Sequence, residues 1–173
     1  IRNATPPAYE PPLDPPDPHP PVIVGGPVLP AVVLNELITS GRALVRRLHI
    51  PGPQQDPEPR YRPSQALADF VRCRDLTCRF PGCGRPADLC EIDHTIPYSC
   101  GGLTHASNLK ALCKKHHLLK TFWRGPDGWT DRQHPDGTII WTAPSGGTYR
   151  TEPGSKLLVP SLSVSTGELP GHH

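Results

Sequence analysis

The sequence lacks methionine, is poor in aromatic residues and contains no long uninterrupted apolar run. Aromatic residues make up 6% of the 173 residues, and apolar residues 35%. The apolar stretch VIVGGPVLPAVVL at 22–34 is broken by Gly and Pro, whereas a membrane-spanning helix needs about 20 apolar residues. The sequence also shows no basic segment followed by an unbroken apolar core, which is the pattern of a secretory signal. We therefore expect a cytoplasmic protein with no membrane partner, and a chain beginning at Ile1 is expected to be part of a longer one.

Proline, by contrast, is abundant and unevenly placed. Of the 25 prolines, eleven lie in the first thirty residues and five lie within 51–63. Proline interrupts helices and central strands, so neither stretch can hold a long regular element. The sequence thus predicts five successive segments. They are a Pro-rich linker at 1–30, the helical end of an upstream domain at 31–50, a second Pro-rich linker at 51–60, a packed domain with a hairpin tail at 61–152, and a disordered tail at 153–173.

The charge is also uneven along the chain. Residues 60–124 carry eleven Lys or Arg and five Asp or Glu, an excess of +6, whereas the whole chain carries +2. A basic middle segment favours a polyanionic partner. A solvated charged face is the alternative explanation of the same excess.

Short patterned segments within 61–152 predict a mixed helical and stranded domain. RPSQALADFVRCRD has apolar residues on one helical face and Ser64 at the N-cap position. LCEIDHTIPY and LKAL are strand-like, and a helix is expected at 114–122. Three turn signals, GPDGW, HPDGT and PSGGT, then separate short β-type runs, a pattern typical of successive hairpins.

Six cysteines stand at 73, 78, 83, 90, 100 and 113. Cys78 and Cys83 flank the turn RFPG, and the segment CKKH places Cys113 and His116 at the spacing of a knuckle that enters a helix. Two such pairs can form a closed tetrahedral site, and three sulfurs with one imidazole suit a structural Zn²⁺. Either Cys90 or Cys100 could replace one of these four ligands, and disulfides remain the alternative for a secreted protein.

A second site is indicated by His117, which directly follows a predicted zinc ligand. Adjacent helical residues are rotated by about 100°, so His117 must face away from an ion that His116 binds. Asp93 and His94 are the obvious partners for it. In a regular strand these two would point to opposite faces, so we expect the strand to end or bend there, close to Pro97.

These residues resemble a known family. The pair DH at 93–94, followed by Asn108 and His117, resembles the motif of the HNH, or ββα-metal, nucleases. The segments YRPSQALADFVRCRDLTCRFPGC, CEIDH, NLKALCKKHHLLK and the GW…PDGT tail are similar to a large bacterial family with an HNH domain behind an upstream domain of unknown function. The resemblance implies an α+β fold, with a zinc-stapled ββα (His-Me finger) core, a preceding helix and a C-terminal β-hairpin tail.

The resemblance also implies a role for each motif residue. Asp93 and His117 would bind one divalent cation, Mg²⁺ or Mn²⁺, and His94 would be the general base for the attacking water. Asn108 would hold the loop of His94 in place by hydrogen bonds. The reaction would hydrolyse a phosphodiester of nucleic acid, expected to be double-stranded DNA, and leave a 5′-phosphate and a 3′-hydroxyl.

Basic side chains near these motifs are expected to contact phosphates. Lys120 takes this role from the resemblance, and the expected phosphate track also includes Lys114, Lys115, Arg79 and Arg85. The rival hypothesis is a non-cleaving zinc-ribbon module that binds nucleic acid or serves assembly. Such a module would need only the zinc ligands. The presence of the complete HNH motif therefore favours the enzyme; its residues are Asp93, His94, Asn108 and His117.

Overall fold

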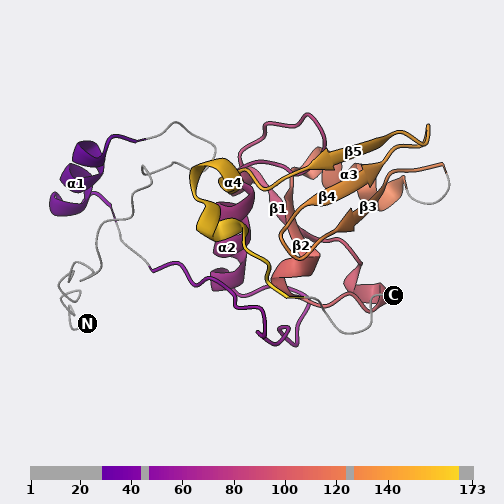
Figure 1. The fold of residues 1–173 in the computed structure, drawn as a ribbon, viewed down its shortest axis with the longest axis horizontal. Coiled ribbons are helices and arrows are strands. Elements are labelled where there is room, and N and C mark those ends of the chain that lie inside the picture. The colour runs from indigo at the N-terminus through magenta and orange to yellow at the C-terminus, as the bar shows by residue number, and fades with distance from the viewer. Residues whose placement is uncertain (1–28, 44–46, 124–126, 168–173) are drawn as a thin grey trace, which may run out of the picture.

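A computed structural model of the chain describes residues 29–43, 47–123 and 127–167. Most of the predicted linker at 1–30 therefore lies outside the described residues. The predicted helical segment at 31–50 begins with α1 (Ala31–Thr39), which buries no residue and which Figure 1 shows set apart from the rest of the ribbon. Across the described residues, every helix is too short or too polar to cross a bilayer.

Helix α2 (Gln65–Asp75) forms one side of the core. As predicted, the Ser64 hydroxyl caps it, accepting a hydrogen bond from the Leu67 N–H at 3.2 Å. The apolar face of α2, with Leu67, Phe70 and Val71, packs against residues that include Leu109.

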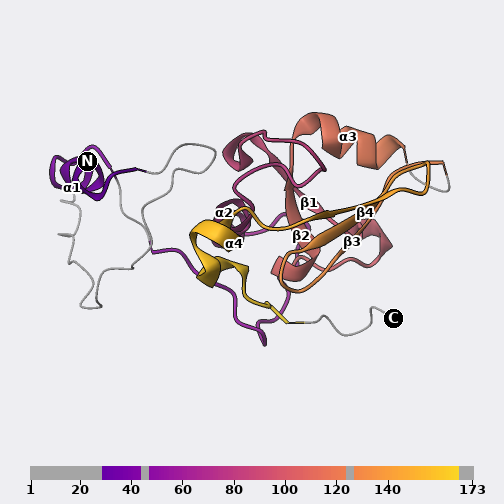
Figure 2. The ribbon, with the colours of Figure 1, turned by 45° about the horizontal axis from the view of Figure 1, so that its top comes forward.

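The centre of the domain is a β-hairpin followed by a helix. Strand β1 (Glu91–His94) pairs antiparallel with β2 (Leu109–Leu112), and α3 (Lys114–Phe122) begins immediately after β2. Figure 2 shows α3 at the upper edge of the hairpin. Short 3-10 turns lie before β1 and in the connection between the strands, at Ala87–Leu89, Tyr98–Cys100 and Ala106–Asn108. The mixed helix and strand architecture confirms the predicted α+β class.

A three-stranded antiparallel sheet follows, as the turn signals predicted. Its strands, in the order β3-β4-β5, are Thr130–Gln133, Ile139–Thr142 and Thr148–Thr151. On β4 the buried residues alternate, and the Trp141 indole N–H donates to the Arg79 carbonyl at 2.9 Å. This sheet is thereby attached to the loop that follows α2.

The prediction of a disordered tail from residue 153 is wrong for 153–167. Helix α4 (Ser155–Leu158) and a 3-10 turn (Pro160–Ser163) pack beside α2, and Leu162 joins the core around Phe70. Both ribbon views show this yellow segment next to α2 (Figures 1 and 2). The tail orders because its few apolar side chains cover α2, whereas residues 168–173 lie outside the described residues.

The second predicted linker also packs against the domain. The Glu58 N–H donates to the Thr104 carbonyl at 2.9 Å, and the Glu58 carboxylate accepts from the Ser64 N–H at 2.6 Å. Proline excludes a long helix here but does not exclude an extended segment lying on the surface of a domain. We call residues 58–64 the strap, because both of its ends are held.

Candidate active site

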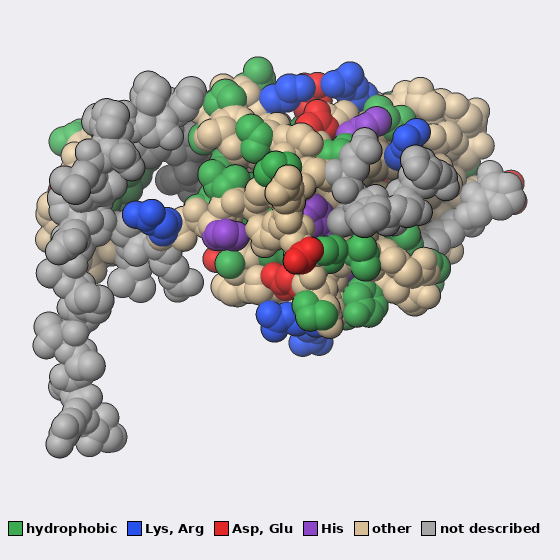
Figure 3. Space-filling model, turned by 60° about the horizontal axis from the view of Figure 1, so that its bottom comes forward, with side chains coloured by type: hydrophobic (Ala, Val, Ile, Leu, Met, Phe, Trp, Pro, Cys, Tyr) green, Lys and Arg blue, Asp and Glu red, His purple; other side chains and the backbone are tan. Residues whose placement is uncertain are grey.

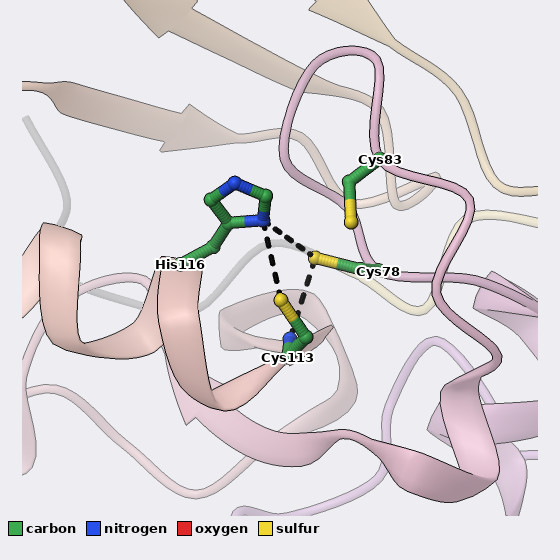
Figure 4. Close-up of side chains that lie close together, drawn as sticks. All are labelled: Cys78, Cys83, Cys113 and His116. Atoms are coloured by element: carbon green, nitrogen blue, oxygen red, sulfur yellow. Dashed lines mark hydrogen bonds between the residues drawn. The ribbon is translucent and has the colours of Figure 1, made fainter.

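Four side chains form the cluster that the sequence predicted for zinc. Ligand atoms of Cys78, Cys83, Cys113 and His116 all lie within 4.8 Å of one another, and Figure 4 shows them converging at the start of α3. The Cys78 and Cys113 sulfurs lie 3.5 Å and 3.3 Å from His116 Nδ1. Tetrahedral zinc, with Zn–S about 2.3 Å and Zn–N about 2.0–2.1 Å, would separate such atoms by about 3.6 Å. These two separations are close to those around tetrahedral zinc, so the cluster could hold a zinc ion.

The two remaining candidate ligands stay outside this cluster. The Cys90 thiol lies 3.2 Å from the Pro86 carbonyl, to which it donates, and Cys100 is exposed. Burial, together with the neighbouring Cys83 and Cys113, raises the pKa of the Cys78 thiol far above its ordinary value. A buried group of thiols ionises only when a cation compensates its charge, which is how metal binding becomes coupled to folding.

Asp93 and His117, predicted to share a cation, lie side by side. Asp93 Oδ1 on β1 is 3.4 Å from His117 Nε2 on α3. Two ligands at about 2.1 Å from one octahedral ion lie about 3.0 Å apart when adjacent and about 4.2 Å apart when opposite. The observed separation is close to that of two adjacent ligands, so a small shift would let both groups bind one divalent cation.

His117 has a further partner that the sequence analysis did not identify. Its Nδ1 atom contacts the carboxylate of Glu91, which leaves Nε2 facing Asp93. Carboxylates commonly fix the ring orientation of metal-binding histidines in this way. Glu91 stands two residues before Asp93 on a strand, hence on the same face, and that alternation is the sequence signal that could have found it.

The second oxygen of Asp93 belongs to a buried ion-pair network. Oδ2 lies 2.6 Å from Lys120 Nζ and 2.9 Å from Lys110 Nζ. Asp131 on β3 completes the network, with Oδ2 2.7 Å from Lys110 Nζ. Burial by itself raises the pKa of Asp93, but the two ammonium groups outweigh it and lower that pKa to about 2. Asp93 is therefore ionised at neutral pH and presents Oδ1 toward His117.

Two of the predicted phosphate contacts are corrected by their positions. Lys120 is 3% exposed, and its ammonium is bound to Asp93 and to the His94 carbonyl. Burial and the neighbouring Lys110 lower its pKa to about 8. Arg79 is 2% exposed and donates to Asp75 and to the Thr151 carbonyl. Both side chains are held inside the domain because carboxylates there compensate their charge.

The remaining members of the expected track, Lys114, Lys115 and Arg85, are exposed. On the face shown in Figure 3, Lys and Arg side chains lie in separate patches with acidic and apolar side chains between them. That face therefore offers scattered cationic contacts instead of one continuous basic strip.

His94 is the last residue of β1. Its Nε2 is 2.9 Å from the Thr104 hydroxyl, and its ring stacks on Tyr61 with centroids 5.4 Å apart. Burial, with smaller effects of Lys110 and Lys120, lowers the pKa of His94 even though Asp93 acts in the opposite direction. The imidazole is thus neutral near pH 7 and able to accept a proton. The structure joins Asp93 to His117 by contact, whereas the His94 ring contacts Thr104, Tyr61 and Tyr98.

Asn108 closes the loop that follows β1. Its Oδ1 accepts from the Ile96 N–H at 2.8 Å, and its Nδ2 donates to the Ile96 and Leu103 carbonyls at 3.0 Å and 2.9 Å. Every one of these bonds is to backbone. These bonds join the two ends of the loop between β1 and β2, and the role that the resemblance implies for Asn108 stays a prediction.

A β-hairpin followed by a helix, with a Cys₃His cluster at the start of that helix, is the arrangement expected of a ββα domain. Comparison with known families agrees: residues 77–122 match the family described as HNH endonuclease, so this chain carries an HNH domain. The strap, α2 and the β3-β4-β5 sheet lie outside the matched residues.

Two relatives come from Mycobacterium tuberculosis (strain ATCC 25618 / H37Rv). "Uncharacterized protein Rv3776" is 59% identical over 149 residues, which are 86% of this chain and 28% of that protein. "Uncharacterized protein Rv2100" is 55% identical over 160 residues, which are 91% of this chain and 28% of that protein. The chain thus spans little more than a quarter of the length of these relatives. No solved structure matches it.

Proposed function

We propose that this chain is a metal-dependent endonuclease domain that hydrolyses phosphodiester bonds of DNA. The observation that carries the proposal is the 3.4 Å separation of Asp93 Oδ1 and His117 Nε2 within an HNH domain. An ionised carboxylate and an imidazole nitrogen suit Mg²⁺ or Mn²⁺, with positions left for substrate oxygens. The Cys₃His cluster is assigned to structural zinc, because four protein ligands leave no open position.

The residues divide the reaction between them. Asp93 and His117 would hold the cation, which would supply positive charge beside the phosphate and the leaving oxygen. His94 takes the proton of the attacking water, a task for which a neutral imidazole is suited. Asn108 keeps the loop after β1 in the conformation that places His94. Lys114 and Lys115, exposed at the start of α3, contact phosphates of double-stranded DNA.

A second candidate function is a non-cleaving nucleic-acid-binding or assembly module. One observation favours it: Lys110 and Lys120 already neutralise Asp93, with Nζ–Oδ2 distances of 2.9 Å and 2.6 Å. A carboxylate engaged in this way attracts a cation less strongly than a free one. The nuclease is preferred because Oδ1 of the same carboxylate is directed at His117 and not at a lysine.

The proposal is tested by nicking of supercoiled plasmid in a series of divalent cations. Wild-type protein is expected to nick DNA with Mg²⁺ or Mn²⁺ and to stop when EDTA is added. His94→Ala is expected to abolish nicking while zinc content and melting temperature stay unchanged. His105→Ala is the matched control, since it removes another buried imidazole that is bonded to Ser107 instead. DNA binding without nicking in every metal would favour the non-cleaving module.

A further inference from the structure

The hydroxyl of Thr104 contacts both the strap and the ring of His94. Thr104 Oγ1 lies 2.5 Å from the Arg60 carbonyl and 2.9 Å from His94 Nε2. A carbonyl oxygen can only accept, so the single hydroxyl proton points to Arg60, and the Tyr61 carbonyl at 3.3 Å competes for the same proton. Only the lone pairs of the Thr104 oxygen can then face the imidazole. His94 Nε2 must therefore carry a proton and donate it to this oxygen.

We propose that the strap sets the tautomer of His94 through Thr104, so that a neutral His94 carries its proton on Nε2 and presents Nδ1 as the basic nitrogen. Thr104 and the strap are positioning elements for the base and do not themselves touch substrate. The link to catalysis rests on the proposed function, whereas the tautomer itself follows from the hydrogen bonds alone.

The opposite tautomer is disfavoured by burial. With the proton on Nδ1, the Nε2 lone pair would face the Thr104 hydroxyl, which could satisfy it only by releasing the Arg60 carbonyl. Thr104 is fully buried and His94 is 5% exposed, so water is poorly placed to repair the lost bond. The observed arrangement satisfies both groups at once.

The strap is built to keep the Arg60 carbonyl in place. Glu58 pairs through its backbone with Thr104 itself, and its carboxylate accepts from the N–H of Ser64 at the other end of the strap. Between these anchors, the ring of Tyr61 stacks on His94 at an interplanar angle of 14°. The strap, which lies outside the matched HNH residues, therefore fixes both the orientation of the His94 ring and the position of its proton.

The test uses the full zinc-loaded chain with ¹⁵N-labelled histidine. At pH 8, where an imidazole of ordinary pKa is neutral, long-range ¹H–¹⁵N spectra report which ring nitrogen carries the proton, and His94→Gln identifies the signals. Wild-type His94 is expected to be protonated on Nε2. Thr104→Val removes the acceptor at nearly constant volume, and Thr104→Ser restores it.

The Thr104→Val variant is expected to lose the Nε2 preference and to lower kcat by about 10–100-fold with KM little changed, a part of what general-base catalysis contributes. Thr104→Ser should recover both. Ser107→Ala is the matched control, because it removes a hydroxyl bonded to the neighbouring His105, and it should leave the His94 signals and kcat unchanged.

A wild-type His94 protonated on Nδ1 would overturn the inference, whether or not any variant folds. It would also be overturned if Thr104→Val kept the same tautomer and the same kcat. The two proposals can also fail separately. If wild-type protein fails to nick DNA but its His94 is protonated on Nε2, and Thr104→Val loses this preference, the proposed function is refuted and the tautomer assignment is supported.

Discussion

Replacing Cys113 by Ser is expected to unfold the domain. Cys113 occupies the N-cap position of α3, its sulfur lies 3.3 Å from His116 Nδ1, and its N–H donates to the Cys78 sulfur. Serine is a much poorer ligand for zinc than a thiolate. The substitution therefore separates the start of α3 from the loop that carries Cys78 and Cys83.

The magnitude follows from what surrounds the cluster. Its buried neighbours include Trp141, Leu112 and Ile139, but the rest are mostly alanine and cysteine. Phe80, stacked on His116 at 4.0 Å and in edge contact with Trp141, links the Cys₃His cluster to the β3-β4-β5 sheet. Structural zinc contributes about 10–16 kcal/mol to folding in small zinc domains, whereas whole domains are stable by about 5–15 kcal/mol. Losing even about 5 kcal/mol would lower the melting temperature by about 20–40 °C in a domain of 60–100 residues.

Thermal melts followed by circular dichroism, beside zinc content by mass spectrometry, measure this effect. Wild type is expected to hold one zinc per chain and to melt cooperatively. Cys113→Ser is expected to hold little zinc and to show no cooperative transition near the melting temperature of wild type. Cys100→Ser is the control, since Cys100 is exposed and outside the cluster, and it should match wild type. A Cys113→Ser protein that melts within a few degrees of wild type would refute the zinc staple.

Two further predictions concern metal and DNA. Glu91→Ala removes the carboxylate on His117 Nδ1 and is expected to weaken Mn²⁺ binding by about 10–100-fold in calorimetric titrations of zinc-loaded protein; unchanged affinity would show that Glu91 does not orient the ring. Affinity for duplex DNA is expected to fall steeply with salt, and Lys114→Ala with Lys115→Ala should reduce the slope of log K against log salt by about 2. A slope that is shallow in wild type, or equal in both proteins, would remove these lysines from the interface.

The parts of the site that depend on local spacing could be predicted from the sequence. The two ligand pairs of the zinc cluster each lie within one turn, and α3 spans the predicted residues 114–122. The cap at Ser64 and the three-stranded tail also follow from short-range patterns. In each case, neighbouring residues contain the whole signal.

The remaining parts depend on contacts between distant segments. Lys110 faces Asp93 because β1 and β2 pair in that register, and a strand pattern alone does not reveal which partner residue lies opposite. Thr104 meets the Arg60 carbonyl across 44 positions of sequence, in loops without periodicity. Arg79 looked like a surface charge because the Thr151 carbonyl, which accepts a hydrogen bond from its guanidinium, lies 72 positions away in the sequence.

The central claim is that Asp93 and His117 share one divalent cation, and anomalous scattering from crystals soaked in Mn²⁺ tests it most directly. We predict a manganese peak between Asp93 Oδ1 and His117 Nε2, about 2.1 Å from each, that is absent from crystals of the His117→Ala variant. Manganese bound elsewhere only, or a peak that persists in the variant, would contradict the account.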